Sequence, residues 1–336
     1  MKPKVTIICI TYNHEKFIAE ALDSFLMQKT DFPFEVIVGE DCSSDRTTEI
    51  VRQYARNYPD IIKPVFQKNN VGPYQNTLSA YKQIQGEYVI NNEGDDYFSD
   101  PLKLQKQVDF LDSHPEYSIC FHPVKVIWED KSNQDYIFPE PKYRDNKALL
   151  TTNELVKSNF IQTNSCMYRW RFKQDKHLLD YFPEDIIPGD WYMHLLHAQT
   201  GKIGFLPDVM TVYRRHRGGM WWLASENPEK LHLQYGMKII NFYYNVYKNI
   251  TQFSEKYFDI FFENFCTIVN AYYKNKRFHE LSLINSRYSE FFDLMFANVN
   301  SQETRIHKKY TKYKKISKIL ILINILLILL LVFLVI

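Results

Sequence analysis

The chain has 336 residues, which is enough to bury one large hydrophobic core or two smaller ones. Its 41 basic and 39 acidic side chains nearly cancel to a net charge of +2, so the charge balance does not indicate a nucleic-acid partner. Five cysteines are scattered without the CxxC spacing of a zinc site. They are interpreted as reduced residues of a cytosolic protein, which excludes a disulfide framework.

From residue 5 to about residue 115, short apolar runs alternate with stretches of helical periodicity. The first run is too short for the hydrophobic region of a secretory signal. The runs are typical of strands buried on both faces of a parallel sheet. They cover Val5 to Ile10, Phe34 to Val38, Ile61 to Phe66 and Glu87 to Ile90. The pattern predicts an open, mostly parallel α/β sheet, in which ligands bind at the carboxyl ends of the strands.

Polar or turn-forming residues follow each of these four strands. They are Tyr12, Asn13 and His14, then Glu40 and Asp41, then Asn70 and Gly72, and finally Glu93, Asp95 and Asp96. Because the carboxyl ends of parallel strands meet at one edge, we expect these residues to share a site. The last group lies in NNEGDDYFSD, residues 91–100. Such carboxylates suit a divalent cation bound together with phosphates, but they are also common in a turn before a helix, and the residues alone leave both readings open.

The pattern loosens after residue 116, where short strands are predicted at 117–121, 124–128 and 208–216. A helix is expected to open at Gly189-Asp190-Trp191, and the chain after Glu226 is helical and rich in aromatic residues. We therefore divide the chain into five parts. They are the two halves of one domain (1–115 and 116–222), a helical region (223–304), a basic segment (305–318) and an apolar segment (319–336).

The apolar segment has one polar residue, Asn324, in eighteen. As a helix it would be about 27 Å long, close to the ~30 Å hydrocarbon thickness of a bilayer. Seven basic residues precede it and favour the cytoplasmic side of a membrane: Arg305, Lys308, Lys309, Lys312, Lys314, Lys315 and Lys318. We expect a single-pass transmembrane anchor with the rest of the chain at the cytoplasmic face. The alternatives are a buried or partner-binding helix, or the first span of a longer protein.

The chain lacks the GxxxxGK[ST], GxGxxG and HExxH patterns. Over residues 3–220 it resembles family 2 glycosyltransferases, which have the GT-A fold. The resemblance is carried, in order, by VTIICITYNHEKFIAEALDSFLMQ, EDCSSDRTTEIV, the NxG at Asn70 to Gly72 and EGDDYFSDPLKLQKQ. The last of these is similar to the family's DxD motif, with Glu93 in place of the first Asp and Gly94 in the middle.

The resemblance implies that residues 1–222 are a catalytic domain with a nucleotide-binding half (1–115) and an acceptor half (116–222). It also implies a nucleotide-sugar donor, a divalent cation (Mn²⁺ or Mg²⁺) and a set of residues for each. Along the donor it places Thr11, Tyr12, Asn13, Asp41, Asn70, Gly72, Asn76, Glu93, Asp96, Arg214 and His216. Within this set, Asp41 accepts a hydrogen bond from the base, with Glu40 as its neighbour. Asp95 is implied as the metal ligand, and His216 completes the shell of the metal or of the phosphates. Arg214, Arg215 or Arg217 would counter phosphate charge.

Asp190 matches the acid that family members use as the general base, although this chain reads PGD where xED is commoner. The alternative is that Asp190 only caps a helix. The function implied is inverting, metal-dependent transfer of a sugar to a glycan or lipid-linked acceptor in surface polysaccharide synthesis. Two rivals remain open from the residues. They are a metal-dependent nucleotidyltransferase or phosphohydrolase, and a non-catalytic module that binds nucleotide sugars.

Overall fold

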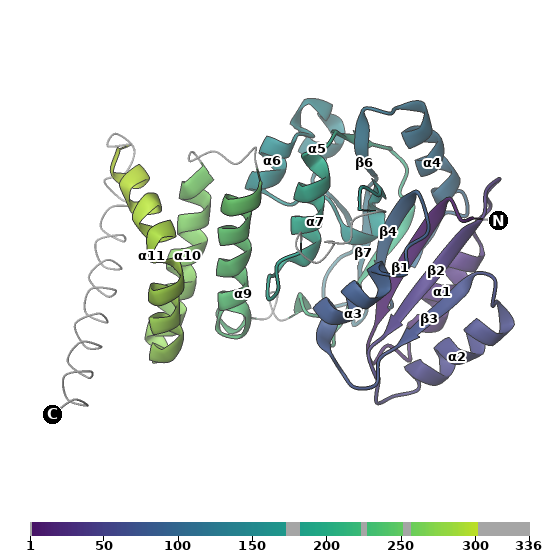
Figure 1. Ribbon diagram of the computed structural model, residues 1–336, viewed down its shortest axis with the longest axis horizontal. Helices are drawn as coiled ribbons and strands as arrows, with labels where there is room; N and C mark the ends of the chain where they lie inside the picture. The colour runs from purple at the N-terminus through teal and green to yellow at the C-terminus, as the bar shows by residue number, and fades with distance from the viewer. Residues whose placement is uncertain (1, 173–181, 223–226, 251–256, 302–336) are drawn as a thin grey trace. The chain divides into compact units, whose positions relative to one another are not determined.

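The structure is a computed structural model that describes residues 2–172, 182–222, 227–250 and 257–301 (Figure 1). The chain forms two compact units. The first unit comprises residues 1–184 and 189–216, and the second comprises 185–188 and 217–336. The predicted apolar segment 319–336 and the basic segment before it lie outside the described residues, and within those residues no helix is long and apolar enough to cross a membrane.

A seven-stranded sheet in the order β10-β6-β9-β4-β1-β2-β3 is the centre of the first unit. The strands are β1 (Val5–Thr11), β2 (Phe34–Glu40), β3 (Ile62–Phe66), β4 (Tyr88–Glu93), β6 (Tyr117–Phe121), β9 (Met167–Arg169) and β10 (Lys202–Phe205). Strand β9 is antiparallel to both of its neighbours, and the other pairs are parallel. The predicted mostly parallel α/β sheet is therefore confirmed.

Helices cover both faces of this sheet, which explains the continuous apolar strands. One face, with Val5, Ile7 and Cys9 of β1, packs in a cluster with α1 (Ile18–Leu26), α2 (Thr47–Asn57) and α4 (Lys103–Ser113). The other face carries the equally buried Ile8, where α3 (Gly72–Tyr81) contacts β1 and β2, and α7 (Gly189–Ala198) contacts β6. Shorter helical elements are α5 (Pro141–Asp145), η1 (Lys147–Leu149), α6 (Thr152–Lys157) and η2 (Thr163–Ser165).

A second, four-stranded sheet has the order β5-β11-β7-β8. Its strands are β5 (Tyr97–Phe98), β7 (Val124–Trp128), β8 (Tyr136–Phe138) and β11 (Thr211–Arg215). Strand β11 pairs with β5, Val212 opposite Tyr97. This pairing returns the chain beyond residue 211 to the loop after β4, so His216 reaches the acidic residues that precede β5.

The described part of the second unit contains three helices, α9 (Pro228–Asn249), α10 (Phe258–Lys274) and α11 (Phe278–Ser301). Aromatic side chains pack between them, as between Tyr243 and Phe261, whose ring centroids are 4.3 Å apart. Within its described residues, the region predicted as helical from 223 to 304 is helical apart from short connections. The aromatic runs seen in the sequence are explained by this packing.

Candidate active site

The register of the large sheet brings the polar strand ends together. Thr11 at the end of β1 lies opposite Glu40 of β2, and Ile10 lies opposite Glu93 of β4. The three carboxyl ends are therefore adjacent at one edge, as the sequence predicts. The loops that follow these strands form the site.

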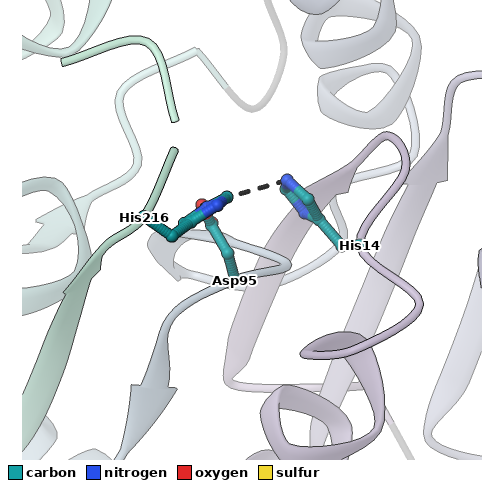
Figure 2. A group of neighbouring side chains, drawn as sticks. All are labelled: His14, Asp95 and His216. Atoms are coloured by element: carbon teal, nitrogen blue, oxygen red, sulfur yellow. Dashed lines mark hydrogen bonds and ion pairs between the residues drawn. The ribbon is translucent and has the colours of Figure 1, made fainter. Parts of the chain in front are cut away.

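A cluster of two histidines and a carboxylate lies at this edge (Figure 2). His216 Nε2 is 2.8 Å from Asp95 Oδ2, and His14 Nε2 is 3.9 Å from the same oxygen. The three donor atoms lie within 4.8 Å of one another, and Asp95 is only 6% exposed. Asp95 Oδ1 is buried and has no hydrogen-bond partner among the described residues. These atom types, together with the free acceptor, fit a divalent cation.

Gly94 allows this close arrangement. A Cβ atom at position 94 would lie 2.6 Å from Thr11 Oγ1 and 3.0 Å from His14 Nδ1. Since even the smallest side chain would collide with the end of β1, only glycine fits without displacing the loop. The missing side chain in the middle of the EGD triplet is thus a packing requirement.

Asp96 bonds to residues of β11 and η2. Its Oδ1 accepts from the Arg214 backbone N–H at 2.8 Å, and its Oδ2 accepts from Asn164 Nδ2 at 3.1 Å. Asn164 is fully buried and also donates to the Val212 carbonyl. Asp96 therefore fixes the end of β11, and with it His216, to the loop after β4, while its predicted contact with the donor stays a prediction.

Asp41 organises the loop before α3. Its two carboxylate oxygens accept from the backbone N–H groups of Val71 and Gly72, at 2.8 and 2.9 Å. Asn70 Nδ2 donates to the Asp41 carbonyl, and Gly72 has a positive φ of 83°. Each carboxylate oxygen has a second lone pair, so these bonds leave capacity for a further donor such as a base N–H.

Asp190 lies in the first turn of α7. Its Oδ2 accepts from Thr163 Oγ1 at 2.8 Å, and its side chain is half-buried. The residue after Thr163 connects this carboxylate to the acidic loop, because Asn164 Nδ2 donates to Asp96 Oδ2. Asp190 and Asp96 are thus bonded to adjacent residues of η2, while the role of Asp190 as the base stays a prediction.

Comparison with known protein families shows to which family the chain belongs. The model of Glycosyl transferase family 2 matches residues 6–216, which contain every residue of the cluster. The chain belongs to this family. An uncharacterised protein of Mycobacterium tuberculosis is 44% identical over 226 residues, which are 67% of this chain and 63% of that protein. The poly(ribitol-phosphate) beta-N-acetylglucosaminyltransferase TarS of Staphylococcus aureus is 30% identical over 64% of this chain and 36% of its own.

Solved structures agree on the fold of this family 2 glycosyltransferase. Staphylococcus aureus TarS in complex with UDP-GlcNAc has a TM-score of 0.55 and 24% identity, covering 81% of this chain and 73% of that chain. A mannosyltransferase of Pyrobaculum calidifontis in complex with GDP-Man and Mn²⁺ has a TM-score of 0.53 and 18% identity, covering 97% and 87%. At these identities the likeness shows the GT-A-like fold alone.

Arg214 contacts side chains of several elements. Its guanidinium donates to Glu20 Oε2 at 2.6 Å and lies 4.6 Å from the ring centroid of Phe17 and 5.2 Å from that of Tyr97. Arg214 is only 6% exposed, and its Nε lies 3.5 Å from Glu129 Oε2. In this family 2 glycosyltransferase Arg214 connects β11 to α1, and its predicted part in countering phosphate charge stays a prediction.

Other predicted donor contacts have structural bonds of their own. Asn76 is fully buried, donates to the Gly39 carbonyl at 2.8 Å and accepts from Gln67. Asn13, with a φ of 56°, accepts from the Ser44 N–H and so joins the loops after β1 and β2. Tyr12 is 44% exposed beside it. Burial favours a structural part for Asn76, whereas Tyr12 is open to a ligand.

The charges at the cluster favour a cation. Burial alone would raise the pKa of Asp95, but the hydrogen bond from His216 lowers it below its usual range. Burial, followed by the charges of Asp95 and Glu93, raises the pKa of Asp96 well above the usual range. Burial lowers the pKa of His14, which favours the neutral imidazole that binds metals.

Proposed function

We propose that this family 2 glycosyltransferase moves a sugar, with inversion, from a nucleotide-sugar donor to a glycan or lipid-linked acceptor, and that it depends on Mn²⁺ or Mg²⁺. The observation that carries the proposal is that two adjacent residues join Asp190 to the acidic loop: Thr163 donates to Asp190 at 2.8 Å, and Asn164 donates to Asp96 at 3.1 Å. Donor and metal are supported by the fold that the chain shares with structures binding UDP-GlcNAc, and GDP-Man with Mn²⁺.

In this mechanism Asp190 takes the proton of an acceptor hydroxyl while its oxygen attacks the anomeric carbon of the donor. The bond between that carbon and the diphosphate oxygen breaks, and the nucleoside diphosphate leaves with the electron pair. One displacement inverts the configuration, so no carboxylate nucleophile is needed. Thr163 holds the base by its hydrogen bond. A cation held by Asp95 and His216 would neutralise charge on the leaving diphosphate.

We also propose that the chain works at the cytoplasmic face of the bacterial inner membrane, in surface polysaccharide synthesis. The support is the apolar segment 319–336 with the basic segment 305–318 before it. Tethering would raise the local concentration of a lipid-linked acceptor. Both segments lie outside the described residues, so this part rests on the sequence.

The test begins with a thermal-shift screen of nucleoside diphosphates and nucleotide sugars with and without Mn²⁺, which finds the donor. Asp190→Asn should then lower the rate of transfer at least about a hundredfold. Donor affinity should be unchanged, because asparagine keeps the shape of the aspartate side chain but cannot act as the base. Asp109→Asn, an exposed acid on α4, is the control and should transfer normally. Unchanged turnover in Asp190→Asn would refute the base assignment. Donor cleavage that needs no acceptor would favour a hydrolase.

A further inference from the structure

We propose that His14 is a third protein ligand of the metal, so that His14, Asp95 and His216 bind a divalent transition-metal ion before any nucleotide arrives. The inference deepens the proposed function and rests on its metal dependence. From the sequence, His14 is only one of the polar residues expected after the first strand.

The spacing of the three donor atoms suits an ion between them. Nitrogen and carboxylate ligands lie about 2.1 Å from such an ion, so two of them are about 3.0 Å apart at a right angle and about 4.2 Å apart on opposite sides. The two Nε2 atoms lie 2.8 and 3.9 Å from Asp95 Oδ2, the first just below this range and the second within it, and all three donor atoms lie within 4.8 Å of one another. Small side-chain rotations would complete the site.

The neighbouring acidic cluster, Glu93 with Asp95 and Asp96, is a poorer alternative. Both Asp96 oxygens accept hydrogen bonds, from the Arg214 backbone N–H and from Asn164, and Asp96 is only 2% exposed. Turning Asp96 toward an ion would break both bonds and release β11. Asp95 Oδ2, in contrast, already lies within 3.9 Å of the Nε2 atoms of both histidines.

The backbone at both histidines is held in place before any ion binds. The His14 backbone N–H donates to Thr47 Oγ1 at 2.8 Å, and Thr47 is fully buried. The ring centroids of Phe17 and His216 are 4.8 Å apart, and the strand before His216 is fixed through Asp96. Because the backbone is already positioned, binding needs only small rotations of the two side chains.

The composition of the site predicts which ions it takes. Mg²⁺ prefers oxygen ligands and is usually held by one or two carboxylates with substrate phosphates, so it needs the nucleotide. Two imidazoles with one carboxylate suit Mn²⁺, Co²⁺ or Fe²⁺ and do not need phosphate oxygens. We therefore expect the nucleotide-free protein to bind Mn²⁺ and Co²⁺ more tightly than Mg²⁺.

The experiment is a Mn²⁺ titration of the full chain without nucleotide, with free Mn²⁺ followed by electron paramagnetic resonance. Wild type should bind one ion, His14→Ala should weaken binding by more than about tenfold, and His279→Ala, which removes an exposed histidine of α11, should bind as wild type does. Pulsed spectra should show coupling to two imidazole nitrogens in wild type and to one in His14→Ala.

A wild-type spectrum with a single imidazole nitrogen would overturn the proposal without recourse to any variant, so misfolding of His14→Ala cannot obscure the answer. Equal Mn²⁺ affinity of His14→Ala and wild type would also overturn it. Either result leaves the proposed function intact if transfer still needs metal and Asp190. Conversely, two coupled nitrogens with Asp190→Asn fully active would support His14 and refute the proposed base.

Discussion

Thr163 is the residue through which the proposed base is oriented, because its hydroxyl donates to Asp190 across the site. Replacing it with valine keeps the shape but removes a hydrogen bond to a charged group, which is worth about 1.5 to 3 kcal/mol. We expect Thr163→Val to lower kcat about tenfold or more with little change in the KM for the donor. Steady-state kinetics with the donor found by the thermal-shift screen would measure both.

Thr163→Ser restores the hydroxyl and should recover most of the lost kcat, which a purely structural defect would not do. The matched control is Thr267→Val on α10, which also loses one hydroxyl hydrogen bond, to Glu263. If Thr163→Val keeps wild-type kcat, or if serine does not rescue it, Thr163 does not position the base.

Some residues of the site could be predicted from the sequence and others could not. Asp95 and His216 were placed together because each matches a family motif, and the structure brings them within 2.8 Å. The bond of Arg214 to Glu20 of α1 could not be predicted, because the run RRHR does not tell which side chains of β11 face α1. His14 had no signal beyond its place after a strand, since its partner at position 216 is near only through the pairing of β11 with β5.

At the scale of elements, local patterns predicted the first half of the fold and missed the small sheet. The runs before residue 91 are continuous and apolar because helices cover both faces of the large sheet. The pairs of the small sheet join residues 97–98 and 124–128 to 211–215. Pairing between strands so far apart in the chain leaves no periodicity in the sequence. The single strands could therefore be predicted, but their order in the small sheet could not.

Helix α4 offers a pH prediction, because its first residue, Lys103, is fully buried. Lys103 Nζ donates to Gln107 Oε1 at 2.6 Å and lies 4.3 Å from the Phe98 ring centroid. Burial lowers the pKa of Lys103 from 10.5 to about 7. Between these two values the unfolded chain holds a proton that the folded chain has lost, so rising pH stabilises the fold by up to about 1.4 kcal/mol per unit.

We therefore expect Lys103→Met to remove this contribution. The unfolding free energy of wild type, measured by urea denaturation, should rise relative to that of the variant between about pH 7.5 and about pH 9.5. Lys82→Met, at an exposed lysine after α3, should differ from wild type by the same amount at each pH. Parallel curves for wild type and Lys103→Met would show that Lys103 does not lose its proton on folding.

At the scale of the whole molecule, the described site residues all belong to the first unit. The family match ends at residue 216, and so does that unit. Beyond this match, the described helices of the second unit were predictable only from apolar periodicity. The match spans 63% of the Mycobacterium tuberculosis relative and 36% of TarS. These relatives therefore give no information on the part of this chain that the match does not cover.

The last prediction concerns the apolar segment 319–336. If it spans a bilayer, the full chain should sediment with membranes and stay there in high salt, because salt screens charge but does not weaken burial in hydrocarbon. Deleting residues 319–336 should move the protein to the soluble fraction with Mn²⁺ binding unchanged, since the proposed ligands lie in the first unit. If the shortened chain stays on membranes but is released by salt, the basic segment 305–318 is the anchor, through anionic headgroups. If the shortened chain stays on membranes even in high salt, neither the apolar segment nor the basic segment is the anchor. The aromatic-rich helices of the second unit would then be the candidates.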